Sequence, residues 1–253
     1  MIETEGVLYM NEKLNLQIPD EGDFFYREAI KKLRANVQFS GKKNKIIMIT
    51  SVFSGEGKSE VSFHLALEMA NAGKKVLFVD ADIRKSVFID RYSVTGEVVG
   101  LSEFLSGQVD RVDQIIYPTN FEGLSVIMAG HYAPNPAEML GDEQFSTLLR
   151  MESQRYDYVF VDTPPLGQVI DAALVGQYCD GAVLILESGA ASRQAALRVK
   201  EQIEKSGCRI LGAVLNRVSR SGEGYYGSRY GKYGKYGKYG RYDKYGAYSK
   251  YGE

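Results

Sequence analysis

The sequence predicts an α/β fold in which helices flank a mostly parallel β-sheet, followed by a disordered C-terminal tail. Short runs of mainly Ile, Val, Leu, Phe and Met recur along residues 1–220, as is typical of strands buried on both faces. Longer amphipathic stretches separate several of these runs, as expected for helices in right-handed βαβ units. The aliphatic runs then stop, and residues 221–253 contain no Leu, Ile, Val or Met.

The sequence predicts four helices and six strands within residues 1–220. The helix after the first strand has Val61, Leu65 and Met69 at four-residue spacing, which indicates one buried helical face. The helix before the first strand is rich in charge, which is typical of a solvated face. The predicted helices cover 24–39, 58–71, 144–153 and 192–205, and the predicted strands cover 45–51, 76–80, 124–129, 158–162, 182–187 and 210–216.

The last 33 residues differ in composition from the rest of the chain. They hold seven Lys/Arg and three Asp/Glu, a net charge of +4 in a chain whose total is −1, so residues 1–220 carry −5. Glycine makes ordering costly, and no aliphatic side chain offers burial in return. We therefore predict a folded domain, 1–220, and a flexible tail, 221–253. The tail tyrosines are Tyr225, Tyr226, Tyr230, Tyr233, Tyr236, Tyr239, Tyr242, Tyr245, Tyr248 and Tyr251.

Composition excludes several classes of protein. No apolar run approaches the ~20 residues that span a bilayer, and the N-terminus lacks the basic-then-apolar pattern of a secretory signal. Two cysteines, Cys179 and Cys208, are too few for a disulfide scaffold and are expected to be inert core thiols. His64 and His131 are the only histidines, so a structural zinc site is not expected. These features favour a reduced, cytosolic protein.

A glycine-containing loop follows the first predicted strand and opens the next helix. Such a loop can point backbone N–H groups at phosphate oxygens, and the helix N-terminus favours negative charge. Lys58 would reach the β- and γ-phosphates of a nucleotide, and Ser59 would ligate Mg²⁺. The alternative is a simple glycine turn, and Val52 replaces the first glycine of the usual pattern. The predicted nucleotide-binding residues here are Ser54, Gly55, Glu56, Gly57, Lys58, Ser59 and Glu60.

Three aspartates stand at or just beyond the ends of apolar strands. Asp80 and Asp82 follow the run 76–79, and Asp162 follows the run 158–161. Carboxyl ends of parallel strands meet at one edge of a sheet, where α/β proteins bind ligands. One carboxylate can hold Mg²⁺, and another can accept a proton from an attacking hydroxyl. A single aspartate could be a turn former, but three beside a phosphate loop favour a nucleotide site.

These motifs together resemble those of the bacterial tyrosine kinases of capsular and exopolysaccharide synthesis, which are related to the MinD/ParA class of P-loop ATPases. The resemblance covers essentially the whole chain. It includes the Walker A loop 51–59, the D-x-D-x-R motif 77–84, the Walker B motif 159–165, the Pro-Asn-Pro-Ala-Glu segment 134–138 with Asp171, and the tyrosine cluster 225–251.

The resemblance implies an ATP-dependent protein-tyrosine kinase that phosphorylates its own tail tyrosines in trans. It implies Lys58, Asp80, Asp82 and Asp162 as catalytic residues, with either Asp80 or Asp82 as the base. Ser59, Asp82 and Asp162 would surround Mg²⁺. Asn216 lies where MinD-like relatives contact adenine, although it could also be a strand-terminal turn residue.

The resemblance also implies partners. The family uses an E-x-x-R-x-x-R helix for contacts within a ring, and this chain offers Glu28, Lys31 and Arg34. Lys31 replaces the first arginine and cannot form the same bidentate contact. Split members are activated by a membrane adaptor, which implies a peripheral position at the inner face of the membrane. The resemblance implies a phosphotyrosine phosphatase that reverses the reaction, and it implies no nucleic-acid partner.

Two other functions stay open at this point. A MinD/ParA-like positioning ATPase would use the same pocket and release phosphate to water. Phe53 stands where that branch carries a signature lysine, which argues against this alternative. The other function is single-stranded nucleic-acid binding, because the tail interleaves tyrosine with Lys/Arg and glycine. Phosphotyrosine formation would distinguish the kinase from both.

Overall fold

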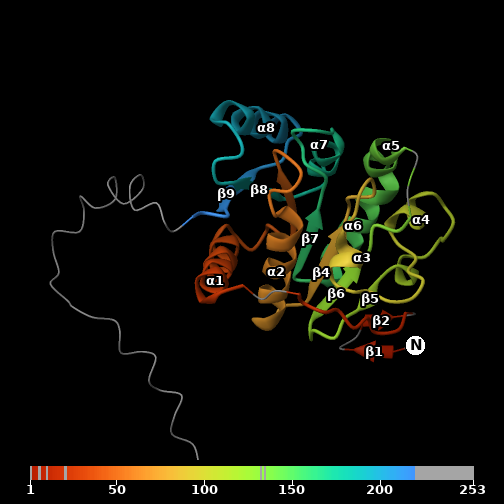
Figure 1. The fold of residues 1–253 in the computed structure, drawn as a ribbon. Helices are drawn as coiled ribbons and strands as arrows, with labels where there is room; N and C mark the ends of the chain where they lie inside the picture. The colour runs from red at the N-terminus through yellow and green to blue at the C-terminus, as the bar shows by residue number, and fades with distance from the viewer. Residues whose placement is uncertain are drawn as a thin grey trace, which may run out of the picture. The chain divides into compact units, whose positions relative to one another are not determined.

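The structure is a computed structural model that describes residues 2–4, 7–9, 11–19, 22–131, 133 and 135–219. Met1–Arg217 fold as one unit. Figure 1 shows its central sheet with helices on both faces. The predicted flexible tail and its ten tyrosines lie outside the described residues.

The central sheet has seven strands in the order β5-β6-β4-β7-β3-β8-β9. All neighbouring strands run parallel except β5, which is antiparallel to β6. The predicted mostly parallel α/β fold is therefore confirmed. The strands are β3 (Ile46–Ser51), β4 (Val76–Asp80), β5 (Tyr117–Pro118), β6 (Leu124–Ile127), β7 (Tyr158–Asp162), β8 (Gly181–Glu187) and β9 (Ile210–Asn216).

Two apolar cores cover the two faces of the sheet. Along β3, Ile46 and Met48 belong to one core, and Ile47 and Ile49 belong to the other. Because both faces are covered, all six residues of β3 are buried, which explains its continuous apolar sequence. The first core holds the helices α4 (Leu101–Leu105), α5 (Pro136–Gly141), α6 (Glu143–Arg155), α7 (Asp171–Gly176) and α8 (Arg193–Lys205). The second holds α1 (Phe24–Phe39), α2 (Lys58–Asn71) and α3 (Phe88–Arg91).

The long helices begin at residues whose side chains accept a hydrogen bond from the first turn. Asp23 caps α1, Asp142 caps α6 and Ser192 caps α8. Such caps satisfy N–H groups that otherwise have no partner in the helix. α2 is different, because it begins after Gly57 without a side-chain cap. Its N–H groups stay available for a ligand.

The predicted long elements agree with the structure within one or two residues at each end. The structure also contains elements that were not predicted: the N-terminal hairpin of β1 (Ile2–Thr4) and β2 (Val7–Tyr9), the strand β5, the short helices α3, α4, α5 and α7, and the 3-10 turn η1 (Val112–Gln114). Each has only two to six residues, too few to show a periodic apolar pattern.

Two expectations about composition can be compared with the fold. Cys208 is buried and Cys179 is partly buried, and both are free thiols. Burial raises the pKa of Cys208 to about 11 and raises that of Cys179 as well, so both thiols are unreactive at neutral pH. None of the helices in the described ranges has the length and apolar character that crossing a bilayer requires.

Candidate active site

The carboxyl ends of three adjacent strands, β4, β7 and β3, form one wall of a cavity of about 610 Å³. Asp80 and Asp162 are direct neighbours across β4 and β7. The cavity is also lined by the phosphate loop and by the segment that follows β4. The structure therefore brings Lys58, Ser59, Asp80, Asp82 and Asp162 together at the sheet edge expected from the sequence.

The phosphate loop owes its shape to two glycines and one buried carboxylate. Gly55 and Gly57 have φ values of 84° and 82°, which side-chain-bearing residues rarely adopt. Glu56 is 1% exposed. Its carboxylate accepts hydrogen bonds from the backbone N–H groups of Val52 and Phe53 at 2.7 and 2.8 Å. Glu56 thus braces the loop from inside, and its side chain does not line the cavity.

Asn216 supports the same loop from the end of β9. Its side-chain amide donates to the carbonyl of Glu56 at 2.9 Å, and a Cβ on Gly57 would lie 2.2 Å from Asn216 Nδ2. A Cβ at position 57 would therefore displace the Asn216 amide from Glu56, in addition to the strain of a positive φ. Asn216 does not line the cavity, so its contact with adenine stays a prediction.

Lys58 lies at the centre of the charged network. Its ammonium is 2.8 Å from Asp162 Oδ1 and 3.1 Å from Ser59 Oγ. Ser62 donates to the same Asp162 oxygen at 3.1 Å. Lys58 and Asp162 are only 7% and 2% exposed, so each charge depends on the other. Binding of a nucleotide would offer Lys58 phosphate oxygens in place of Asp162.

Asp80 and Asp82 have different surroundings. Asp80 is 2% exposed, and it accepts hydrogen bonds from the Ser86 hydroxyl and the Asp82 backbone N–H. Burial, followed by the charge of Asp162, raises the pKa of Asp80 to about 7. Asp82 is partly exposed at the cavity wall. Burial also raises its pKa, against the opposing effect of Lys58.

Arg84 and Asp171 form a bidentate ion pair that was absent from the predicted site residues. Arg84 Nε and Nη2 donate to the two Asp171 oxygens at 2.5 and 2.9 Å. Asp171 is fully buried at the start of α7, whereas Arg84 is 38% exposed and lines the cavity. The sequence signal was the arginine that closes D-x-D-x-R, but the partner lies 87 residues away.

The rim of the cavity carries two further interactions. Glu60, predicted to bind nucleotide, pairs with Arg91 at 3.1 Å. The backbone N–H of Ser54 donates to Gln168 Oε1 at 3.2 Å. Gln168 and Arg91 line the cavity, and neither was named from the sequence because no motif marks them.

The donor set fits a magnesium ion that is bound together with a nucleotide. Mg²⁺ typically takes one or two carboxylates, phosphate oxygens and water. Ser59, Asp82 and Asp162 line one cavity with oxygen donors. Within the described part of the chain, no three His, Cys, Asp or Glu residues form a metal-binding group. The protein oxygens therefore suit an ion that is held largely by phosphate and water.

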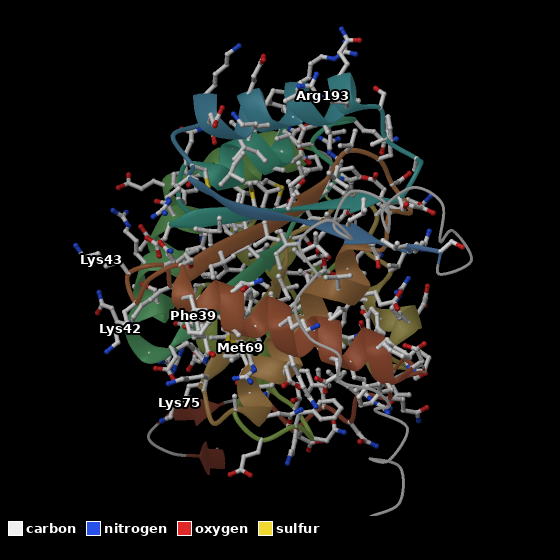
Figure 2. All side chains as sticks on the ribbon, turned by 90° about the vertical axis from the view of Figure 1, so that its left-hand side faces the viewer. Phe39, Lys42, Lys43, Met69, Lys75 and Arg193 are labelled. Atoms are coloured by element: carbon white, nitrogen blue, oxygen red, sulfur yellow. The ribbon has the colours of Figure 1, made fainter. Side chains whose placement is uncertain are left out.

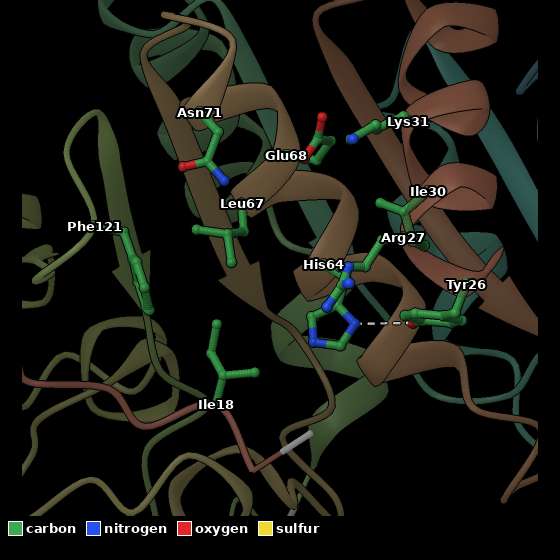
Figure 3. A pocket seen from close by; sticks show the side chains of 10 residues that line it. All are labelled: Ile18, Tyr26, Arg27, Ile30, Lys31, His64, Leu67, Glu68, Asn71 and Phe121. Atoms are coloured by element: carbon green, nitrogen blue, oxygen red, sulfur yellow. Dashed lines mark hydrogen bonds between the residues drawn. The ribbon is translucent and has the colours of Figure 1, made fainter. Parts of the chain in front are cut away.

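The residues expected to form contacts between protomers lie on α1. Lys31 pairs with Glu28 at 2.8 Å, and Arg34 contacts Glu68 of α2 at 3.5 Å. Beside them is a hollow of about 260 Å³ between α1, α2 and Phe121. Figure 3 shows Lys31 at its rim and the hydrogen bond between Tyr26 and His64 within it, which is 2.9 Å long. This hollow shares no lining residue with the cavity at the phosphate loop.

Known proteins of similar sequence and structure indicate the family of this chain. A family model described as an AAA domain matches residues 44–205. The tyrosine-protein kinase CpsD of Streptococcus agalactiae is 44% identical over 207 residues, which cover 82% of this chain and 89% of that protein. The solved kinase domain of the Escherichia coli tyrosine kinase Etk superposes with a TM-score of 0.71 at 35% identity, covering 76% of this chain and 77% of that one.

Two further structures place the fold in a wider group. The chimerical protein CapA2B2 matches with a TM-score of 0.74 at 29% identity, over 83% of this chain and 95% of that one. The cell-division ATPase MinD of Pyrococcus furiosus matches with a TM-score of 0.61 at 26% identity, over 70% of this chain and 73% of that one. MinD is thus a relative in fold, whereas the curated relatives are kinases. The chain belongs to the bacterial tyrosine-protein kinases of the CpsD and Etk type.

Proposed function

We propose that this kinase transfers the γ-phosphoryl group of Mg·ATP to the tyrosines of its own C-terminal segment, in trans between neighbouring copies. The observation that carries the proposal is the convergence of Lys58 and three aspartates on one cavity beside a phosphate loop. Ten tyrosines in the last 33 residues supply acceptors within the same chain. Each tail would reach a neighbour's cavity, since an acidic body attracts a basic segment.

The chain's own residues have distinct tasks in this transfer. The phosphate loop binds the phosphates through its backbone N–H groups, and Lys58 turns from Asp162 to the β- and γ-phosphates. Bound Mg²⁺ supplies positive charge that stabilises the phosphates during transfer. The acceptor phenol oxygen forms a bond to the γ-phosphorus as the bond from that phosphorus to the ADP oxygen breaks.

Asp82 is the base that takes the proton from the acceptor tyrosine. It is partly exposed at the cavity wall, and its raised pKa makes it a better proton acceptor than an ordinary aspartate. Asp80 is buried, and both of its oxygens already accept hydrogen bonds. Asp80 therefore positions the segment that carries Asp82. Asp82→Asn should lower the single-turnover transfer rate by about 10²-fold or more.

Phosphorylation would change the net charge of the tail from positive to negative. Each phosphate adds about −1.5 to −2 charge, so full modification takes the tail from +4 to roughly −11 to −16. An acidic body would repel such a tail. We infer a cycle in which unmodified copies assemble into a ring, phosphorylated copies disperse, and a phosphotyrosine phosphatase resets them. Identical sedimentation of the two forms would contradict the cycle.

The proposed partners follow from the relatives. The contacts within the ring would use Glu28, Lys31 and Arg34, which lie on one helix. Names of the CpsD type support a role in capsular or extracellular polysaccharide synthesis and export. A membrane adaptor of the polysaccharide co-polymerase type would activate the kinase and hold it at the inner face of the membrane.

The decisive experiment mixes two full-length variants with Mg·ATP. One is Lys58→Met, which has an intact tail. The other has a wild-type cavity and Phe in place of all ten tail tyrosines. Phosphotyrosine on the Lys58→Met chain, identified by intact mass, would establish both transfer and its direction in trans. The adaptor's cytosolic segment is added if activity is low.

Two controls define the outcomes of this experiment. Lys58→Met alone should give no phosphotyrosine, and a chain ending at Arg220 should lose the acceptors. ATP hydrolysis without phosphotyrosine, even with the adaptor, would contradict the proposal and favour a positioning ATPase. Salt-sensitive RNA binding that depends on the tail would instead favour a nucleic-acid-binding role.

A further inference from the structure

Two turns at the amino-terminal edge of the sheet have the same sequence, Gly-Lys-Lys. The turn 41–43 connects α1 to β3, and the turn 73–75 connects α2 to β4. Both flank the start of β7. The carbonyl of Lys45 accepts from Val159 N, and the carbonyl of Lys75 accepts from Asp157 N, each at 2.8 Å. β3 and β4 are two strand spacings apart in the sheet, so the strands that follow the two turns are about 10 Å from each other.

An exposed aromatic ring lies beside these turns. Phe39, the last residue of α1, is 84% exposed, the highest fraction among the exposed large apolar side chains of the described residues. Figure 2 shows Phe39, Lys42, Lys43 and Lys75 on the same side of the molecule. We call Phe39, Lys42, Lys43, Lys74 and Lys75 the basic edge.

Three lysines of the basic edge, Lys42, Lys43 and Lys74, carry charges that no carboxylate of the described residues neutralises. Lys42 and Lys43 are exposed, and Lys74 is half-buried. None of these three forms an ion pair within the part of the chain that the structure describes. Nearby carboxylates instead accept hydrogen bonds from backbone N–H groups. Asp157 accepts from Lys75 N at 2.9 Å, and Asp180 accepts from the N–H groups of Lys45 and Ile46 at 2.8 Å.

The stability of α1 and α2 explains the lysines of the basic edge but not the exposed Phe39. Lysines that follow a helix C-terminus are favoured by the helix dipole, and both turns follow helices. The helix dipole gives no reason for the aromatic ring of Phe39 to be exposed to solvent. An exposed ring among lysines is the composition of surfaces that lie in a membrane interface.

We propose that the basic edge docks on an anionic lipid surface, with Phe39 entering the interfacial layer and the lysines facing the headgroups. The four lysines lie on turns and Phe39 ends α1, and none of the five lines the cavities at α1, at the phosphate loop, along α6 or beneath α8. A flat anionic surface therefore fits them better than a peptide or a small anion. The active-site cavity is at the other end of β3, about 20 Å away for six residues of strand, so it would face away from the lipid.

This inference deepens the peripheral membrane position proposed above, but it needs no adaptor. Each lysine near an anionic membrane strengthens binding about fivefold. The resulting affinity is modest alone, and it would add to an adaptor's hold by raising the effective concentration.

The test is co-sedimentation of the full-length, unphosphorylated protein with phosphatidylcholine vesicles, with and without phosphatidylserine. The test variant is Lys42→Glu/Lys43→Glu. The matched control is Arg193→Glu/Arg198→Glu, which makes the same charge change on exposed residues of α8. Figure 2 shows Arg193 away from the basic edge. The basic tail is present in every protein, so its contribution cancels.

We expect wild type and the α8 control to bind phosphatidylserine vesicles and Lys42→Glu/Lys43→Glu to bind at least tenfold more weakly. Phe39→Ser should lower binding and leave a remainder that high salt removes, since salt screens the lysines. Unchanged kinase activity of these variants would show that they fold. Loss of vesicle binding with intact kinase activity therefore concerns the basic edge alone.

Three results would overturn the proposal. The first is equal binding by the two double variants. The second is binding to phosphatidylcholine vesicles that matches binding to phosphatidylserine vesicles. The third is a loss of RNA binding, with vesicle binding retained, in Lys42→Glu/Lys43→Glu, which would identify a nucleic-acid surface.

Discussion

The two edges of the central sheet hold their charges in opposite ways. At the carboxyl edge, Lys58, Asp162 and Asp171 are almost completely buried, and each meets an opposite charge at 2.5–2.8 Å. At the amino edge, Lys42 and Lys43 are exposed and form no ion pair among the described residues. Desolvation makes each buried charge depend on its partner, whereas water stabilises the exposed ones. Substitutions at the two edges should therefore have very different effects on stability.

The largest effect is expected where one member of a buried pair is removed. Arg84→Gln leaves Asp171, which is 0% exposed, without its guanidinium partner and should destabilise the fold by about 3–5 kcal/mol. Asp171→Asn should have a smaller effect, because Arg84 is 38% exposed and can be hydrated. Urea unfolding of the two variants measures this asymmetry.

The double variant Arg84→Gln/Asp171→Asn is the control for this pair. It removes both charges and should be more stable than Arg84→Gln alone. Equal losses for the two single variants would show that burial of Asp171 does not set the energetics. Asp171→Asn should also lower phosphotransfer more than ATP affinity, since Arg84 lines the cavity beside Asp82.

Asp80 gives a stability change whose sign depends on pH. Its pKa is raised from 3.8 to about 7, so between these values the folded state keeps a proton that the unfolded state releases. Stability therefore falls as pH rises through this window, by about 1.4 kcal/mol per unit at most. Asp80→Asn cannot ionise, and it should be more stable than wild type at pH 8.

The measurement is urea unfolding of both proteins from pH 4 to pH 8. The advantage of Asp80→Asn should become small near pH 4, where the carboxyl is protonated in the folded state and is titrating in the unfolded state. Parallel stability curves across this range would contradict the raised pKa. Phosphotransfer should fall in Asp80→Asn at every pH, so the gain in stability would come with a loss of function.

The sequence predicted the carboxyl edge in more detail than the amino edge. Asp80 and Asp162 were predictable because each ends an apolar strand, and Lys58 was predictable because it stands at the lysine position of the phosphate-loop motif. Asp171 could not be assigned to Arg84, because the two are 87 positions apart and nothing in that interval shows that α7 returns to this edge. Glu56 was predicted as a nucleotide-binding residue, and the structure places its side chain inside the loop. Sequence pattern identifies the loop but not the direction of each side chain.

The amino edge lacks any such motif. Each Gly-Lys-Lys turn is an ordinary helix-to-strand connection when it is considered alone. Only the strand order β4-β7-β3 brings the two turns together, and strand order cannot be obtained from one sequence. The predicted 24–39 helix was correct in its bounds, but nothing in its pattern indicated that its last residue, Phe39, stays exposed.

A smaller effect is expected at the two glycines of the phosphate loop. Gly55→Ala and Gly57→Ala both place a side chain at φ above 80°, which should destabilise the loop by about 1–2 kcal/mol. Gly55 has nothing within 4 Å of the added Cβ, whereas at Gly57 the Cβ meets Asn216 at 2.2 Å. Gly57→Ala should therefore be the more damaging of the two, for stability and for ATP affinity.

Asn216→Ala removes the side chain that an added Cβ at position 57 would meet, so combining it with each glycine variant isolates the effect of that clash. In that background the two glycine variants should become similar in stability, because only the backbone strain remains. A difference that persists without the Asn216 side chain would show that its contact with the loop is not the cause. Nucleotide binding of Asn216→Ala alone measures what the contact contributes to the shape of the loop.

The smallest effect is expected at the amino edge. Lys42→Gln/Lys43→Gln removes two exposed charges that form no ion pair within the described residues, so the free energy of unfolding should change by less than about 0.5 kcal/mol. Residues that add so little to the fold are free to contact another surface, such as the lipid surface proposed for this edge. Urea unfolding at low and high salt measures the change. A decrease in the free energy of unfolding above about 1 kcal/mol would mean that the lysines stabilise the ends of α1 and β3. The charges of the two edges would then differ only in how much they stabilise the fold.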